Sequence, residues 1–212
     1  MLLAIELSGP RNTLAVGDAE RVVSIDFSDQ RGRGLMTALG QLLQDASLEK
    51  HDLRGILVGV GPGSYTGLRI ACSAGIMLGH GLAIPCGGLH SFDAAAFAAT
   101  EEGQTVHLVL DAYRQEVYHA CYRRGAQHLE TLTPAQVLPV AEVATAVGQG
   151  LVLGDPKFTP DGQHLKEDCQ PSAVDLLHFA FTLGVQSDGT GIDALLAAEP
   201  LYLRPAAFRR PS

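Results

Sequence analysis

The sequence predicts an α/β protein built from two similar halves. Short apolar runs alternate with longer stretches of helical period, which is typical of sheets covered by helices. The order β-β-β-α-β-α occurs twice, on either side of a polar stretch at residues 101–104. We therefore expect two lobes, residues 1–103 and 104–212, that share one architecture.

Composition excludes several classes of protein. Of the 212 residues 46% are hydrophobic and 18% are charged, so the chain folds around a core. Fifteen Lys and Arg stand against 23 Asp and Glu, and a net charge of −8 argues against binding nucleic acid alone. The N-terminus lacks a basic segment, and Arg69 and His80 interrupt the longest apolar stretch. We expect a cytoplasmic protein without a membrane segment.

Hydrophobic spacing places the elements of the first half. The helix expected at 35–46 rests on Leu35, Leu39, Leu42 and Ala46, which fall on one helical face. The expected order is strands at 2–7, 13–16 and 22–27, this helix, a strand at 55–60, a helix at about 65–80, a strand at 82–86 and a helix at 91–100.

The second half begins in the same way. The expected order is strands at 106–110, 116–122 and 129–132, a helix at 140–147, a strand at 151–153 and a helix at 172–186. Residues 155–170 are rich in Pro, Gly and charge and predict a long loop. From about Asp188 we expect a tail that packs on the other lobe.

A glycine-rich loop, Gly61-Pro62-Gly63-Ser64-Tyr65-Thr66-Gly67, joins a strand to a helix. Such a loop exposes backbone N–H groups that can hold an anion, with Gly61, Gly63, Ser64, Thr66 and Gly67 as the candidate residues. It matches neither the phosphate-binding and dinucleotide-binding motifs nor the nucleophile elbow. The alternative is a tight turn in which Ser64 or Thr66 caps the helix.

The helix after this loop has almost no polar face, so it must be covered on all sides. Ala71, Gly75 and Gly79 are spaced by four and form a ridge of small residues that a second helix can approach closely. The alternative is an internal helix of a well-covered lobe. Candidate interface residues on this helix and the one before it are Leu35, Leu39, Leu42, Arg69, Ala71, Cys72, Gly75, Ile76 and Gly79.

Metal-binding and redox patterns are missing from the sequence. The four cysteines form no C-x-x-C pair, and no two of the eight histidines lie four residues apart, so we expect free thiols and no metal. Asp111 and Glu116 flank a hairpin-like segment and could act as an acid–base pair. In the alternative, Asp111 caps the turn and Arg114 pairs with Glu116.

Three motifs give the sequence a resemblance to a known family. Residues 61–70, GPGSYTGLRI, match the pattern G-P-G-S-[FY]-T-G-[LV]-R-[IV] along its whole length. Residues 111–118, DAYRQEVY, are similar to D-A-R-x-G-E-V-Y, with Asp111, Arg114, Glu116 and Tyr118 as the motif residues, and residues 200–204 match P-x-Y-L-R. With AIELS at residues 4–8, the chain resembles the TsaB family.

The sequence departs from the family pattern at several positions. Glu6 and Leu7 stand where the family has Asp and Thr, and Tyr113 and Gln115 replace Arg and Gly. Residues 31–34, RGRG, stand where a His-Ser-Glu segment is usual.

The resemblance implies a fold and a function. The fold would be that of actin, Hsp70 and the sugar kinases, with a degenerate ATP site and no cofactor. The function would be a non-catalytic dimerisation subunit in the synthesis of N6-threonylcarbamoyladenosine in tRNA. It would bind TsaD through helices 35–46 and 65–80 and support TsaE, while TsaC makes the threonylcarbamoyl-adenylate. It would contact tRNA only within the complex and form a homodimer when alone.

Two other functions stay open at this point. An active phosphotransferase or ATPase of the same fold would need a nucleotide grip, and residues 6–10, ELSGP, lack the glycine of the D-x-G-[TS] loop. A metalloprotease would need a metal-ligand pair such as the H-x-x-x-H of TsaD, which this sequence does not contain.

Overall fold

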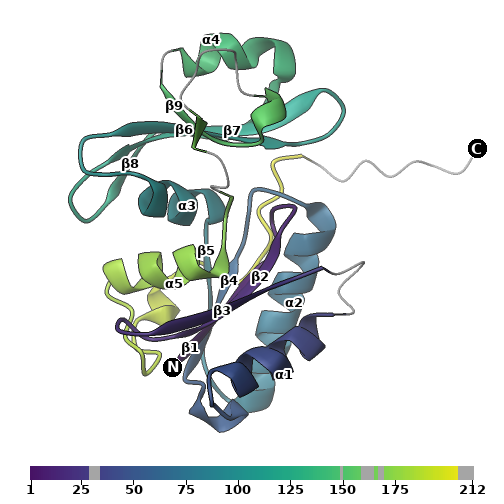
Figure 1. Ribbon diagram of the computed structural model, residues 1–212, viewed down its shortest axis with the longest axis vertical. Helices are drawn as coiled ribbons and strands as arrows, with labels where there is room; N and C mark the ends of the chain where they lie inside the picture. The colour runs from purple at the N-terminus through teal and green to yellow at the C-terminus, as the bar shows by residue number, and fades with distance from the viewer. Residues whose placement is uncertain (29–33, 149, 159–164, 167–169, 205–212) are drawn as a thin grey trace, which may run out of the picture.

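Two five-stranded sheets, one above the other, make up the computed structural model (Figure 1), which describes residues 1–28, 34–148, 150–158, 165–166 and 170–204. The first sheet has the order β3-β2-β1-β4-β5. Its strands are β1 (Leu2–Glu6), β2 (Asn12–Gly17), β3 (Val22–Phe27), β4 (Gly55–Gly59) and β5 (Cys86–Leu89). β1, β2 and β3 are antiparallel neighbours, whereas β1, β4 and β5 run parallel.

The second sheet repeats this topology with the order β10-β9-β6-β7-β8. Its strands are β6 (Thr105–Asp111), β7 (Glu116–Arg124), β8 (Leu129–Pro139), β9 (Leu151–Gly154) and β10 (Leu165–Lys166). β6, β7 and β8 are antiparallel, and β6, β9 and β10 are parallel. The duplicated α/β architecture expected from the sequence is confirmed.

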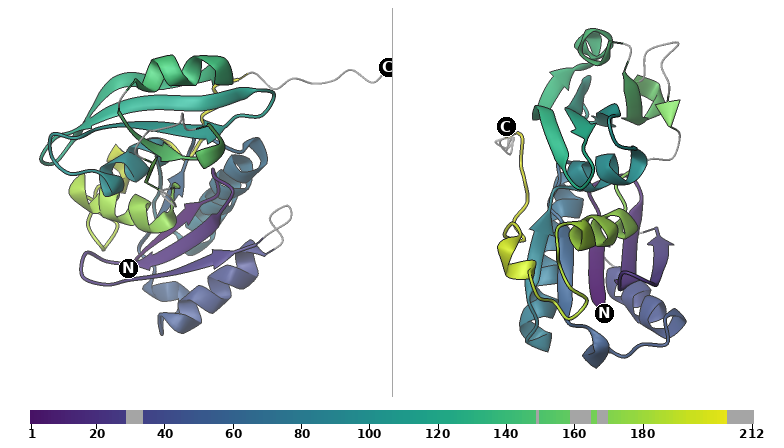
Figure 2. Two further views of the ribbon diagram at one scale, coloured as in Figure 1. Left: turned by 45° about the horizontal axis from the view of Figure 1, so that its top comes forward. Right: turned by 90° about the vertical axis from the view of Figure 1, so that its left-hand side faces the viewer.

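Helices cover both faces of each sheet (Figures 1 and 2). On the first sheet α1 (Leu35–Asp45) and α2 (Tyr65–Leu82) pack on one face, and α5 (Ala173–Thr182) packs on the other. On the second sheet α3 (Ser91–Ala99) and α4 (Val143–Val147) take opposite faces. All five residues of β1 are buried because apolar helices lie on both sides of it.

The lobes meet where α3 contacts α5, with the rings of Phe97 and Phe179 5.2 Å apart. Because α5 packs on the first sheet, the chain returns to the first lobe after completing the second. The change from one sheet to the other lies between α3 and β6, but residues 1–103 and 104–212 as separate domains stay a prediction. Within the described residues, the helices are too short or too polar to span a bilayer.

Several element boundaries differ from expectation; the helix predicted at 172–186, for example, ends at Thr182. The strand predicted at 82–86 is wrong, because α2 continues to Leu82 and the strand is β5, Cys86–Leu89. Gly87 and Gly88 lie within this strand. A Cβ on either would collide with Ile192 or with the backbone of Ala197, which cover the sheet there.

In the second lobe, β8 extends to Pro139 and contains Pro134, which an edge strand tolerates. The predicted helix 140–147 divides into a 3-10 turn, Val140–Glu142, and α4. Further 3-10 turns are Lys50–Asp52, Pro156–Phe158 and Ile192–Ala194. From Gly191 to Leu201 the chain packs on the first lobe, as expected for the tail.

Gly75 and Gly79 of α2 face the first sheet. A Cβ on Gly75 would lie 2.5 Å from Val58 Cγ2 and 3.2 Å from Cys86 Sγ, and one on Gly79 would lie 3.1 Å from the Ile84 carbonyl oxygen. The prediction that this small-residue ridge admits a helix of another chain is therefore corrected. The ridge lets α2 approach its own sheet closely, which is the arrangement of an internal helix.

Two alanine substitutions within α2 test this packing. Gly75→Ala should lower the free energy of unfolding by about 1–3 kcal/mol, because the methyl group overlaps β4 and β5. Gly81→Ala is the matched control, since nothing lies within 4 Å of its added Cβ, and it should raise stability by about 0.5–1 kcal/mol. Urea unfolding of both variants measures the difference. Equal effects would contradict the packing.

Candidate functional site

An apolar groove lies between α1 and α2 on the outer side of the first lobe. Its volume is about 590 Å³. Met36 and Met77 line it and are 57% and 73% exposed, and Ile76 beside Met77 is 50% exposed. The described lining residues are Leu35, Met36, Arg69, Ile70, Ser73, Ala74, Met77 and Leu78. Exposed apolar side chains gathered in one groove are typical of a protein contact surface.

The structure divides the residues predicted for the interface into two groups. Arg69 and Ile76 point outward and are exposed. The other seven are buried within this chain, so their outward placement is corrected: Leu35, Leu39, Leu42, Ala71, Cys72, Gly75 and Gly79. Of these, Leu35 also forms part of the groove floor. The spacing of apolar residues predicted where the helices lie. It did not show which face of each helix packs against the sheet of the same chain.

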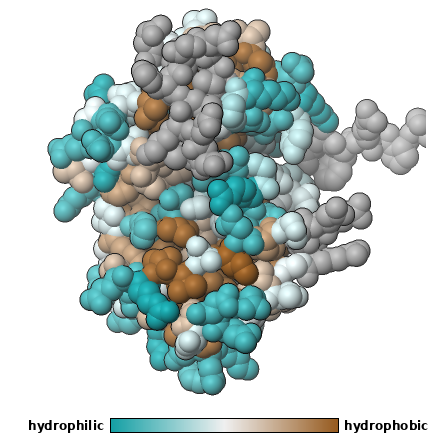
Figure 3. Space-filling model, viewed as in Figure 1, coloured by the Kyte–Doolittle hydropathy of each residue, from teal (hydrophilic) through white to brown (hydrophobic). Residues whose placement is uncertain are grey.

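Exposed methionines were missed by the sequence reasoning. Neither Met36 nor Met77 was among the predicted interface residues, although both lie in predicted helices. A signal was present, since an unbranched side chain with a polarisable sulfur adapts to a partner surface. The same view of the molecule as in Figure 1 shows further hydrophobic residues gathered on the first lobe and surrounded by hydrophilic ones (Figure 3).

One cation stands at the end of the groove. Among the described residues that line the groove, Arg69 is the charged one. Its guanidinium lies 5.5 Å from the centre of the Tyr65 ring, and its Nη1 donates to the Tyr65 hydroxyl at 3.2 Å. Both residues belong to the first turns of α2, so the 61–70 motif reaches the groove directly.

The glycine loop is held by contacts within the chain. Ser64 is the N-cap of α2, since its Oγ accepts from the Gly67 amide at 3.2 Å. The Ser64 amide donates to the Ser8 carbonyl at 2.7 Å, and the Gly61 amide donates to Ser91 Oγ at 3.2 Å. The turn capped by Ser64 is thus what the structure shows. Anion binding by Gly61, Gly63, Ser64, Thr66 and Gly67 stays a prediction.

Close approach explains the glycines of this loop. A Cβ on Gly63 would overlap the Ser8 carbonyl, and one on Gly67 would overlap the Leu7 carbonyl. The loop therefore packs directly on the carboxyl end of β1, which fixes where α2 begins.

A C-terminal strap, residues 195–204, joins the two lobes (Figures 1 and 2). The Tyr202 ring stacks on the Tyr65 ring with centres 4.6 Å apart. Arg204 forms an ion pair with Glu116, and its Nη1 donates to the Ala112 carbonyl at 3.2 Å. All three sequence motifs, at 61–70, 111–118 and 200–204, therefore meet in one place.

The turn between β6 and β7 has an unusual backbone. Tyr113, Arg114 and Gln115 have φ values of 60°, 58° and 62°, a left-handed conformation that costs L-residues free energy. Asp111 Oδ1 accepts from the Tyr113 amide at 2.6 Å, so it caps the turn as one alternative predicted. The ion pair described for Glu116 is with Arg204 rather than with Arg114.

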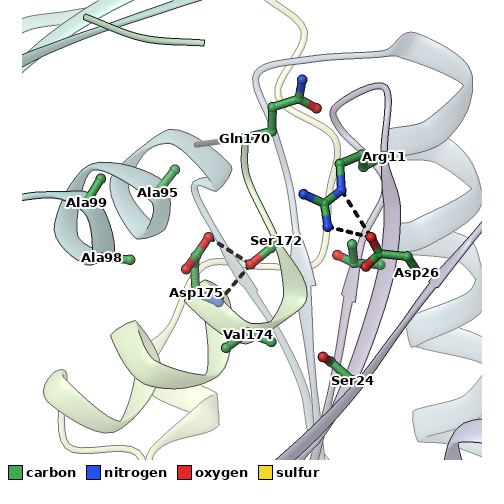
Figure 4. Close-up of a pocket in the computed structure, with 11 residues that line it drawn as sticks. Arg11, Ser24, Asp26, Ala95, Ala98, Ala99, Gln170, Ser172, Val174 and Asp175 are labelled. Carbon is green, nitrogen blue, oxygen red and sulfur yellow. Dashed lines mark hydrogen bonds and ion pairs between the residues drawn. The ribbon is translucent and has the colours of Figure 1, made fainter. Parts of the chain in front are cut away.

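A second pocket, of about 260 Å³, lies between the lobes (Figure 4). Arg11 pairs with Asp26 there, and Ser172 Oγ donates to Asp175 Oδ2 at 2.8 Å. Burial raises the pKa of Asp175. Because the arginine is already paired and a second carboxylate faces the space, this pocket is poorly suited to a polyphosphate.

Glu6 is buried at the carboxyl end of β1 with 0% exposure. Its Oε1 accepts from the Ser8 amide at 2.6 Å. Burial raises the pKa of the Glu6 carboxyl, and Ser8 and Ser91 offset only part of that rise. A buried carboxyl with a raised pKa stabilises the fold most when it is protonated.

Two histidines pack beneath α4 with a cysteine. His107 Nδ1 lies 3.1 Å from His119 Nε2, and Cys121 Sγ lies 3.6 Å from His107 Nε2. Burial lowers the pKa of His119 to about 4. Cys72, Cys86 and Cys121 are free thiols, and Cys169 lies outside the described residues. Across the described part of the chain, no three His, Cys, Asp or Glu residues are arranged to hold a metal ion.

Glu6→Gln should stabilise the protein at alkaline pH. The raised folded pKa means that the stability from Glu6 is present below its ordinary value of 4.5 and is lost as the pH rises through the folded value. Gln cannot ionise, so the variant should unfold at a higher urea concentration than the wild type at pH 8, with the gap closing near pH 4. Glu199→Gln, at an exposed position, is the control. A gap that does not change with pH would contradict this account of Glu6.

Comparisons with known proteins point to one family. The family model "TsaD: tRNA N6-adenosine threonylcarbamoyltransferase" matches residues 27–176. The Bacillus subtilis "tRNA threonylcarbamoyladenosine biosynthesis protein TsaB" is 33% identical over 107 residues, which is 50% of this chain and 47% of that protein. An uncharacterised Mycobacterium leprae protein is 44% identical over 85 residues, 40% of this chain and 23% of that protein. The matched segments thus span less than half the length of these relatives.

Solved structures extend the likeness to both lobes. "YeaZ from Pseudomonas aeruginosa" has a TM-score of 0.76 and 25% identity, covering 95% of this chain and 99% of that one. A second Pseudomonas aeruginosa structure, an uncharacterised protein with similarity to peptidase YeaZ, has a TM-score of 0.77 and 26% identity over 96% of this chain and 99% of that one. The duplicated α/β fold of this chain is shared with these structures over nearly its whole length.

Proposed function

The chain belongs to the family of TsaD, tRNA N6-adenosine threonylcarbamoyltransferase, as a homologue of TsaB, and from this premise we propose that it is a non-catalytic scaffold in tRNA threonylcarbamoyladenosine synthesis. Its partner is a TsaD subunit, which docks in the groove between α1 and α2. The exposed side chains of Met36 and Met77 in that groove are the observation that carries the proposal.

Two features support docking at the groove. Its described lining is apolar apart from Arg69 and Ser73, so burying it against a partner releases water from apolar surface. Its walls are two helices that are anchored on one sheet, so the surface is largely formed before the partner arrives. The same surface on a second copy can form a homodimer when TsaD is absent.

The inter-lobe pocket supports a non-catalytic role. Arg11 is paired with Asp26, and the carboxyl of Asp175 faces the same space, so phosphate groups would meet repulsion there. A net charge of −8 likewise opposes direct binding of tRNA by this chain, so we propose that the complex as a whole binds the tRNA. In this proposal the complex works in the cytoplasm, and TsaE is a further partner. An ATPase or phosphotransferase of this fold is the alternative, and titration of the isolated chain with Mg-ATP distinguishes the two.

Met77→Glu tests the docking surface. A carboxylate in the apolar groove must lose its hydration when the partner binds, so affinity for TsaD from the same organism should fall more than about tenfold. Met77 is 73% exposed, so the fold should be unaffected. Leu183→Glu is the matched control, because Leu183 is 48% exposed and lies after α5, away from the groove. Isothermal titration calorimetry measures both affinities.

The biological role is tested in cells depleted of this chain. Threonylcarbamoyladenosine in their tRNA should fall, and the wild type and Leu183→Glu should restore it while Met77→Glu should not. Unchanged modification after depletion would overturn the proposed function. Full restoration by Met77→Glu would move the docking surface away from the groove.

A further inference from the structure

We infer that the C-terminal strap couples the α1/α2 groove to the turn between β6 and β7, so that occupation of the groove changes how firmly the second lobe holds that turn. The inference rests on the proposed function for the identity of the occupant, a TsaD subunit. The contacts that carry it lie entirely within this chain and exist without a partner.

Side-chain contacts, joined by the short stretch of strap backbone from Tyr202 to Arg204, link the two places. Arg69 lines the groove and lies over the Tyr65 ring, with its centre 5.5 Å away. Tyr65 stacks on Tyr202 of the strap at 4.6 Å. Two residues later Arg204 pairs with Glu116 and donates to the Ala112 carbonyl at 3.2 Å, at the two ends of the turn.

The strap is fixed to the first lobe before it reaches the second. The Gly88 amide donates to the Leu196 carbonyl at 2.7 Å, and the Leu201 amide donates to the Val60 carbonyl at 2.8 Å. Because these two hydrogen bonds hold the strap up to Leu201, only the residues after Leu201 can move when the Tyr65 ring moves. A shift of the Tyr65 ring therefore acts on Tyr202 and Arg204 rather than on the whole strap.

Under this inference the turn is the element that changes its arrangement. Three consecutive residues, Tyr113–Gln115, hold positive φ values, and such a backbone persists only when its surroundings impose it. Arg204 contacts both Ala112 and Glu116, so it bridges the start and the end of this strained segment. Weakening the Arg204 contact would let the turn relax to a right-handed backbone, and coupling needs an element of this kind.

Arg69 gives the coupling its direction. It is the charged member of the described groove lining, so an acidic side chain of the partner would pair with it. Such a pair draws the guanidinium away from the Tyr65 ring and hydroxyl. Loss of that contact loosens the tyrosine stack, and the turn should then open more often when the groove is occupied.

Hydrogen exchange of the free chain tests the coupling without a partner. The reporters are the amides of Ala112 and Glu116, which are hydrogen-bonded within the turn at 3.0 and 3.1 Å. Arg69→Ala should raise their exchange rates about two- to fivefold, the range expected for loss of an exposed cation–π contact. Ser73→Ala is the matched control, because Ser73 lines the same groove, and should leave both rates unchanged. Arg204→Ala should raise them at least as much as Arg69→Ala.

The outcomes separate this inference from the proposed function. If Arg69→Ala leaves both amides unchanged, or if Ser73→Ala changes them equally, the coupling is overturned, whether or not TsaD binds. If TsaD binds the wild type but the exchange of these amides does not rise in the complex, the coupling is likewise overturned and the docking surface stands. If TsaD does not bind at all, the proposed function fails while the coupling within the chain can still hold.

Discussion

The close packing of α2 on the first sheet is the constraint on which the rest of the structure depends. Gly75 and Gly79 bring the helix so near to β4 and β5 that a single methyl group would collide with Val58 or Cys86. This contact fixes the rotation of α2 about its axis. Once the glycines face inward, Met77 and Arg69 must face outward, where α1 adds Met36 to complete the groove.

The same constraint explains why three distant motifs meet. The glycine loop packs on the end of β1 and sets the first turn of α2, so Tyr65 stands at a defined place beside the strap. The strap then delivers Arg204 to the turn between β6 and β7. Residues that occur as separate patterns in the sequence thus form one connected structure along the side of both lobes.

The sequence predicted the fold well because its signals there were local. Period-two and helical spacing gave the repeated order of elements, and of the two candidate caps, Ser64 and Thr66, the structure shows Ser64. The strand at Cys86–Leu89 was missed because glycine is more common in turns than inside strands. The reason for glycine here, the close approach of the covering strap, is visible only in the structure. The predicted interface took in the inner face of α2 because a ridge of small residues suits either a partner or the protein's own sheet. Arg204 and Ala112 are 92 positions apart in the sequence, and no local sequence pattern predicts their contact.

Methionine methyl NMR tests the central claim most directly, that the partner covers the outer face of α1 and α2. The chain has three methionines, of which Met36 and Met77 line the groove and Met1 lies outside it. With 13C-labelled methyl groups, addition of TsaD should shift or broaden the signals of Met36 and Met77 and leave Met1 unchanged. A complex that forms while both groove signals keep their positions and widths would contradict the account.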